Sequence, residues 1–191
     1  PTRARAEKQI VSGFSNAQIN AIIDLKPDLV LGFSDVQADI AKQLIAHGME
    51  VHIFNHRTVD GILRMIRTVG ALVGNPDRAN RLAQQLRADL AAKAKQLASP
   101  RPRVYFEEWN EPLITGIGWV SEIIELAGGD DIFAELAKNS LAKDRTISPA
   151  MVIERCPDII VASWCGKPFR KSELEGRPGW SAIPAGANEE V

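Results

Sequence analysis

The chain has 191 residues, enough for one large domain or two small lobes around a substantial core. Apolar residues make up 45% of it, charged residues 25%, and the formal net charge is −1. This balance is ordinary for a globular protein and gives no electrostatic footprint for DNA or RNA. No apolar run approaches the ~18 residues that a membrane span needs.

The first residues and the cysteines narrow the class further. The chain opens on PTRARAEKQ, with neither a start methionine nor a signal peptide, which is typical of a processed product or a fragment. Cys156 and Cys165 are too few and too close for a disulfide framework, and without a CxxC pair or a Cys/His cluster a structural zinc site is not expected. We interpret Cys156 as a small buried residue before a strand.

The first part of the chain alternates between helical and strand patterns. Residues 16–25 place Ile19, Ile22 and Ile23 on one helical face, with Ser15 or Asn16 as a natural cap. A short buried strand, a helix that stops at Gly48 and a second strand follow at 28–33, 36–48 and 50–54. This order of strand, helix and strand predicts a parallel sheet.

A long helical region follows. Residues 59–74 and 77–98 form two helical segments that meet at GNPD, where Asn75 caps and Pro76 takes the first helical position. A narrow leucine stripe on the second segment fits a helix lying across a surface: Leu82, Leu86, Leu90 and Leu97. After SPRPR, the alternation resumes with a strand, three helices and a strand at 103–107, about 117–127, 131–137, 148–155 and 158–163.

The two halves of the chain resemble each other. Residues 22–34 (IIDLKPDLVLGFS) and 152–164 (VIERCPDIIVASW) both contain a helix end, Pro-Asp and an apolar strand, at a constant offset of 130 residues. Such patterns recur by chance in short βα units. We favour the alternative, which is two structurally similar α/β lobes on either side of the helical region.

Polar and aromatic residues gather where the predicted strands end. In open α/β sheets, ligands bind at the carboxyl ends of strands. Two facing lobes would bring these ends to one cleft, and flat aromatic faces with a few polar groups suit a large, partly apolar ligand. The segments are SGFSN (12–16), GFSD (32–35), FNHRT (54–58), EEWNEP (107–112) and SWCGK (163–167).

Enzymatic and metal sites are weaker interpretations. The WNEP stretch resembles the Asn-Glu-Pro of retaining glycosidases, with Glu111 as acid/base, but that chemistry needs a second carboxylate and a barrel of about 250 residues. His47, His52 and His56 are not clustered by helical spacing, so a metal site from them is not favoured. Dinucleotide-binding, phosphate-binding and nucleophile-elbow motifs are absent.

Several stretches together resemble a known family. NAIIDLKPDLVL, GNPDRA, YFEEWNEPLITGIGWVSEIIELAGGDDIF and PDIIVASWCGKPFR are similar to substrate-binding proteins of the cobalamin, ferric-siderophore and heme class that serve ABC importers, and most resemble cobalamin-binding members. The resemblance implies a periplasmic or extracytoplasmic binding protein that is not an enzyme and has no intrinsic cofactor or metal. Its cargo would be cobalamin, or alternatively a ferric siderophore or heme, with Arg57, Lys167 and Arg170 as candidate cations for an anionic chelate.

The resemblance also implies an architecture. It predicts two α/β lobes with mostly parallel sheets, bridged by one long helix, with ligand in the cleft. The lobes would be 1–58 and 99–191, with 59–98 as the linking helical segment. Both lobes would be incomplete, because the family has a further strand and helix at each end.

Residue roles follow from the same resemblance. Phe33 aligns with an aromatic that lies against the corrin ring, and Phe14 lies near another. Glu107 and Glu108 are adjacent, so alternation sends at most one into the cleft. The family's two permease-docking glutamates correspond to Asn20 and Ala150, so docking to an ABC permease would be weaker or use other groups. The predicted ligand-binding residues are Phe14, Ser15, Phe33, Ser34, His56, Glu108, Trp109, Trp119, Trp164 and Lys167.

Overall fold

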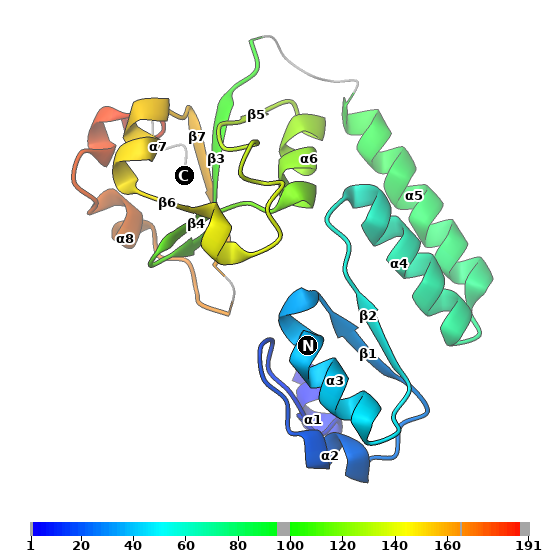
Figure 1. Ribbon diagram of the computed structural model, residues 1–191. Helices are drawn as coiled ribbons and strands as arrows, with labels where there is room; N and C mark the ends of the chain where they lie inside the picture. Colours follow the sequence, from blue (N-terminus) through cyan, green and yellow to red (C-terminus); the bar gives the residue numbers. More distant parts are fainter. Residues whose placement is uncertain (1, 95–99, 165, 188–191) are drawn as a thin grey trace. The chain divides into compact units, whose positions relative to one another are not determined.

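The protein divides into two compact units. The computed structural model describes residues 2–94, 100–164 and 166–187, and the units are Pro1–His56 and Arg57–Val191 (Figure 1). Both units combine helices with strands, so the predicted α/β class is confirmed. We refer to them as the N-terminal unit and the C-terminal unit.

A parallel two-stranded sheet organises the N-terminal unit. Strands β1 (Val30–Phe33) and β2 (Val51–Phe54) pair in register, with Phe33 opposite Phe54. Helix α3 (Ala38–Ala46) connects them after a short 3-10 helix, η1 (Asp35–Gln37). Parallel strands need such a crossover, so the predicted strand-helix-strand order and the parallel pairing are confirmed.

The beginning of the N-terminal unit differs from the prediction. An additional helix, α1 (Thr2–Glu7), precedes the predicted ones. Helix α2 (Ile19–Asp24) starts after Gln18, so the predicted cap at Ser15 or Asn16 is wrong. Asn16 instead closes a loop, because its Oδ1 accepts a hydrogen bond from the Gly13 amide at 3.1 Å. The predicted apolar face of α2 is present, with Ile22 buried.

The C-terminal unit begins with two packed helices, α4 (Val59–Leu72) and α5 (Pro76–Ala94). The side chain of Thr58 caps α4 by accepting from the Gly61 amide at 3.0 Å. The two helices pack at Gly70, where a Cβ would lie 2.1 Å from the Cβ of Ala79. The single long helix implied by the resemblance is therefore two, because the chain turns at Gly74, whose φ is +72°, and Pro76 begins a new helix.

Helix α5 uses small residues for its contact. Ala79 and Ala83 are buried, whereas Leu82 and Leu86 of the predicted leucine stripe are 49% and 37% exposed. Alanine and glycine let the two backbones approach closely, so the packed face is the alanine face and the leucines lie beside it. Leu97, the last residue of that stripe, lies outside the described residues.

The second sheet is mixed and contains the longest strand, β3 (Arg103–Asn110). It pairs in parallel with β5 (Asp130–Asp131) and β7 (Ile159–Ala162), and antiparallel with β4 (Leu113–Thr115), which also pairs antiparallel with β6 (Thr146–Ile147). The strand predicted at 103–107 runs on to Asn110, because β4 folds back along it as a hairpin. EEWNEP is thus mostly inside a strand and its turn, not beyond a strand end.

Helices lie on both sides of this sheet (Figure 1). Helix α6 (Gly118–Leu126) packs on one face through Val120 and Ile124, against Val104. The other face forms the main core, which includes Tyr105, Phe133, Val152, Ile160, Trp180 and Ile183. The elements on that side are α7 (Pro149–Arg155), α8 (Lys171–Glu175), η3 (Trp180–Ala182) and α9 (Pro184–Ala187), with η2 (Ala142–Arg145) before β6.

The short helix predicted at 131–137 is absent. Asp131 belongs to β5, where it pairs with Val104. Its side-chain Oδ1 accepts a hydrogen bond from the Phe133 amide at 2.9 Å, which turns the chain locally. Residues 132–138 then form successive turns, so an aspartate that reads as a helix cap serves here as a strand end.

The sequence repeat at an offset of 130 is also a structural repeat. Helices α2 and α7 begin at Ile19 and Pro149, and each is followed by a left-handed residue, Lys26 with φ 47° and Cys156 with φ 42°. A Pro-Asp pair and a parallel strand follow in both cases. Cys156 ends a helix in this conformation and is exposed, so its predicted burial is wrong.

Candidate functional site

Three rings gather where the strands of the N-terminal unit end. Phe33 is the last residue of β1, His56 follows β2, and Phe14 lies in the loop before α2. The ring centroids of Phe14 and Phe33 are 6.5 Å apart, and those of Phe33 and His56 are 5.0 Å apart. We call these residues the aromatic cluster. Phe14 is 62% exposed, so the cluster offers an apolar ring to solvent.

The backbone beside the cluster turns sharply at Ser34. This residue is buried and has a φ of 75°, a conformation that L-residues rarely adopt. Its amide donates to the Phe54 carbonyl at 2.8 Å, and its hydroxyl donates to Asp35 Oδ1 at 2.8 Å. Ser34 therefore ends β1 and directs the chain into η1, while Ser15 lies exposed in the loop beside Phe14.

The two adjacent glutamates of β3 bond to different arginines. Glu107 is fully buried and accepts from the Arg177 guanidinium at 2.6 and 2.9 Å. Glu108 accepts from the guanidinium of Arg145, whose side chain is only 3% exposed, at 2.6 and 3.3 Å. Each carboxylate is neutralised within the unit by charge-assisted hydrogen bonds.

Two uncharged side chains also donate hydrogen bonds to Glu107. It accepts from Tyr105 Oη at 3.1 Å and from Trp164 Nε1 at 2.9 Å. Burial and, next, the negative charge of Glu107 raise the pKa of the Tyr105 hydroxyl well above its ordinary value. One buried carboxylate thus joins β3, the residues after β7 and the segment after α8.

A second set of contacts holds the residues after β7. The Lys167 ammonium lies 4.8 Å from the Trp164 ring and donates to Glu173 Oε2 at 2.9 Å. The same oxygen accepts from Asn110 Nδ2 at 3.0 Å. Phe169, which is 38% exposed, packs edge-on against Trp164 with centroids 5.1 Å apart. Trp164 itself is only 5% exposed, so Phe169 and Lys167 are the more accessible groups.

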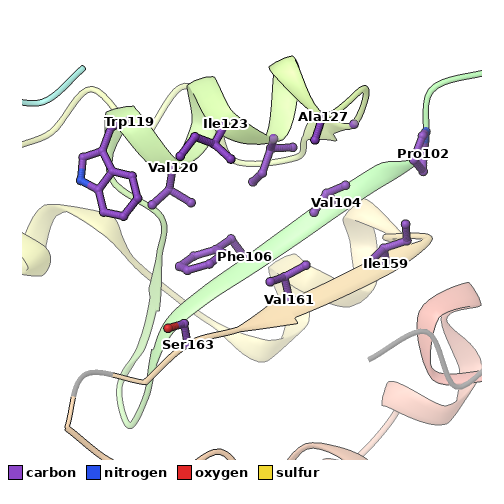
Figure 2. Close-up of a pocket in the computed structure, with 12 residues that line it drawn as sticks. Pro102, Val104, Phe106, Trp119, Val120, Ile123, Ala127, Ile159, Val161 and Ser163 are labelled. Carbon is purple, nitrogen blue, oxygen red and sulfur yellow. The ribbon is translucent and has the colours of Figure 1, made fainter. Parts of the chain in front are cut away.

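The other two tryptophans predicted to bind ligand, Trp109 and Trp119, lie apart from the contacts around Trp164. Trp109 is half-buried in the hairpin and donates through Nε1 to the Glu111 carbonyl at 2.8 Å. Trp119, in the first turn of α6, lies at one end of an apolar pocket of about 450 Å³ between α6 and the sheet (Figure 2). Phe106, Val161 and Ser163 line the pocket below it, and Pro102 lies at the opposite end.

The geometry does not support the enzymatic alternative. Glu111 lies exposed in the turn between β3 and β4, whereas the glycosidase mechanism places its acid at the end of a barrel strand. Among residues 2–94, 100–164 and 166–187, no three His, Cys, Asp or Glu side chains are grouped so as to hold a metal ion. None of the helices described is long and apolar enough to cross a membrane.

The sequence analysis did not predict several residues of the site. Arg145 and Arg177 lie 37 and 70 residues from their carboxylate partners, so no periodic pattern connects them. Phe169 follows SWCGK and carried only the weak signal of an aromatic near a strand end. Glu173 sits in a short helix, α8, that the pattern did not predict.

Two binding proteins are similar to this chain in sequence. A cobalamin-binding protein of Halobacterium salinarum is 30% identical over 162 residues, which is 82% of this chain and 43% of that protein. A vitamin B12-binding protein of Vibrio parahaemolyticus is 27% identical over 161 residues, 82% of this chain and 57% of that protein. The chain thus spans about half the length of these relatives.

Solved structures agree with these matches. The periplasmic vitamin B12-binding protein of Vibrio cholerae superposes with a TM-score of 0.75 at 25% identity, covering 100% of this chain and 73% of that one. An ABC transporter substrate-binding protein of Listeria monocytogenes superposes with a TM-score of 0.78 at 20% identity, covering 100% of this chain and 76% of that one. The relatives named here are all binding proteins by name, and none is an enzyme. The profile of the periplasmic binding protein family matches residues 1–191, and this chain belongs to that family.

Proposed function

We propose that the chain binds a corrinoid as part of an extracytoplasmic solute-binding protein that serves an ABC importer. The observation that carries the proposal is the aromatic cluster at the carboxyl ends of β1 and β2, with Phe14 62% exposed and its ring 6.5 Å from that of Phe33. Aromatic faces bind large apolar surfaces at low conformational cost, and strand ends are the usual ligand position in such sheets. The names of the relatives from Halobacterium and Vibrio support cobalamin as the cargo.

The contacts are assigned by accessibility. In the N-terminal unit the proposed ligand contacts are the aromatic cluster and Ser15. Ser34 is only 5% exposed and its hydroxyl bonds to Asp35, so we assign it to ending β1. In the C-terminal unit they are Trp109, Trp119 and Lys167. Glu108 and Trp164 have their polar atoms committed to Arg145 and Glu107, so we assign them to holding neighbouring groups in place.

The charges of the candidate cations do not decide between a corrinoid and an anionic siderophore chelate. Lys167 lies 2.9 Å and Arg170 lies 3.9 Å from the same carboxylate, that of Glu173, which offsets one of these two positive charges. The choice of a corrinoid therefore rests on the aromatic cluster and on the names of the relatives, and the titration below compares the two ligand classes.

Docking to a permease is part of the same proposal. Asn20 and Ala150 are both exposed in the first turns of the equivalent helices α2 and α7. Neither side chain carries the negative charge that a charge-assisted contact to a permease arginine requires. We therefore propose that docking relies on other exposed groups.

A spectroscopic titration with cyanocobalamin tests the function, with hemin and a ferric siderophore as comparators. We expect saturable one-to-one binding of the corrinoid, weakened at least ~10-fold by Phe33→Ala, since a lost aromatic contact of about 1.4 kcal/mol is tenfold in affinity. The matched control is Ile45→Ala, which removes an apolar side chain that is 59% exposed on α3. Unchanged affinity in Phe33→Ala, or no saturable corrinoid binding by the folded chain, would contradict the proposal.

A further inference from the structure

A single carboxamide joins the loop that carries Phe14 to the strand that carries Phe33. We propose that Gln37 is a positioning residue that sets these two rings at their separation and thereby shapes the ligand-contacting surface. The inference deepens the proposed function and rests on it for the identity of the ligand. The geometry of the carboxamide can be tested without any ligand.

Both polar atoms of the Gln37 side-chain carboxamide form hydrogen bonds to backbone groups. Its Oε1 accepts a hydrogen bond from the Phe33 backbone amide at 2.8 Å. Its Nε2 donates to the Phe14 backbone carbonyl, also at 2.8 Å. The two bonds join the backbones of the two residues whose rings form the cluster. We therefore expect a substitution at Gln37 to shift the backbones that carry the two rings.

The local fold reserves space for this side chain. A Cβ at Gly32 would lie 2.8 Å from Gln37 Oε1 and 2.5 Å from Ile53 Cδ1, so only glycine leaves room for the carboxamide beside β1. The backbone N–H of Gln37 donates to the Ser34 carbonyl at 3.1 Å, which closes η1. The sharp turn at Ser34, with φ 75°, thus brings Gln37 back toward the strand it follows.

The loop that carries Phe14 is closed on itself. Ser12 and Ala17 form an antiparallel bridge, and the Gln18 amide donates to the Val11 carbonyl at 2.8 Å. The Gly13 amide donates to the Asn16 carbonyl at 3.0 Å. These bonds close the loop, and the bond from Gln37 to the Phe14 carbonyl fixes the backbone from which the Phe14 ring projects.

The resulting surface is angled. The planes of Phe14 and Phe33 meet at 42°, and those of Phe33 and His56 meet at 52°. Such rings meet a folded or puckered apolar face better than a strictly flat one, since each ring contacts a different part of it. A corrinoid ring is a ligand of this class, and the separation of Phe14 from Phe33 sets how broad a face is accepted.

At neutral pH, a carboxamide of this length satisfies both backbone groups, because it carries a donor and an acceptor. The Phe33 amide needs an acceptor and the Phe14 carbonyl needs a donor. An ionised Glu accepts but cannot donate, and it repels the Phe14 carbonyl. A protonated Glu supplies both functions again. Met has a similar length and supplies neither strongly. Gln37→Glu therefore converts the link into one that protonation restores.

The test compares Gln37→Glu and Gln37→Met with wild type and with Gln43→Glu. Gln43 is the matched control, because it is exposed on α3 and its side chain donates to the Asp39 carbonyl of its own helix, at 3.2 Å. Hydrogen–deuterium exchange of residues 11–18 at pH 7 is the ligand-independent measurement. We expect exchange at least ~3-fold faster in both Gln37 variants and unchanged exchange in Gln43→Glu.

Cyanocobalamin affinity is the second measurement, at pH 7 and near pH 4. We expect Gln37→Glu to weaken binding ~10-fold at pH 7, as the loss of one hydrogen bond with an uncompensated partner predicts. Affinity should recover toward wild type at pH 4, below the ordinary Glu pKa of about 4.3. Gln37→Met should stay weak at both pH values. Asp35 and His56 are ionisable groups beside the cluster, and measuring wild type at both pH values accounts for them.

The two measurements separate the two proposals. Unchanged exchange of residues 11–18 in both Gln37 variants overturns the positioning role, whatever the ligand. Faster exchange supports that role even when wild type binds no corrinoid, a result that would refute the proposed function alone. Where wild type binds, a Gln37→Glu variant with equal affinity at both pH values overturns the inference.

Discussion

Replacing Glu107 by glutamine tests a buried ion pair of the C-terminal unit, that of Glu107 with Arg177. The Glu107 side chain is 0% exposed and that of Arg177 is 14% exposed, and they form a two-pronged ion pair at 2.6 and 2.9 Å. Glu107→Gln keeps an acceptor for Trp164 but removes the charge that balances the guanidinium. Breaking a buried pair by removing one partner costs 3–5 kcal/mol, and we expect about 3 kcal/mol because Arg177 keeps some contact with solvent.

A second change makes the physical reason testable. Most of the cost of Glu107→Gln comes from the charge left on Arg177, so adding Arg177→Met should recover part of the lost stability. We expect the double variant to be more stable than Glu107→Gln alone. The control is Glu175→Gln, which removes an exposed pair with Lys171 at 3.8 Å and should cost no more than about 0.5 kcal/mol.

Urea unfolding followed by tryptophan fluorescence is the assay. All four tryptophans lie within Arg57–Val191, so the signal reports the unit that contains the pair. The free energy of unfolding comes from the midpoint and the slope. A cost below about 1 kcal/mol for Glu107→Gln, no more than one ordinary hydrogen bond, would refute the reasoning. A double variant less stable than the single one would refute it too.

Three further predictions concern packing, backbone and pH. Gly70→Ala should destabilise the C-terminal unit by about 1–3 kcal/mol in urea unfolding, because its Cβ would lie 2.1 Å from that of Ala79. Lys26→Gly and Cys156→Gly should each stabilise by about 0.5–1 kcal/mol in unfolding followed by circular dichroism, since both residues are left-handed. Burial and a neighbouring carboxylate raise the pKa of Tyr105, so the folded state keeps a proton that the unfolded state releases. Stability should therefore fall as pH rises past about 10, and less steeply in Tyr105→Phe.

Each of these has a matched comparison. Combining Gly70→Ala with Ala79→Gly should restore stability, and a stabilising Gly70→Ala would contradict the close packing of α4 and α5. Lys42→Gly, at an exposed position of α3, should instead cost about 1 kcal/mol. Equal pH slopes for wild type and Tyr105→Phe above pH 10 would show that this hydroxyl is not held protonated by the fold.

Local signals in the sequence determined most of the elements. The apolar runs near 30 and 160 and the helices between them follow from periodicity, and GNPD marks the break between α4 and α5. The repeat at an offset of 130 was readable for the same reason, because a helix end, Pro-Asp and an apolar strand follow one another within a few residues. The aromatic residues at strand ends were found by the same local reasoning.

Only the tertiary structure decided where the polar groups find partners. Glu107 and Arg177 are 70 residues apart, and nothing in either segment indicates the other. The extension of β3 to Asn110 depends on β4 folding back, and the loss of the helix predicted at 131–137 depends on Asp131 pairing with Val104. Gln37 lies 23 residues from Phe14 and reads as an ordinary helix residue. Such contacts depend on which surfaces meet after folding, and no periodic pattern records that.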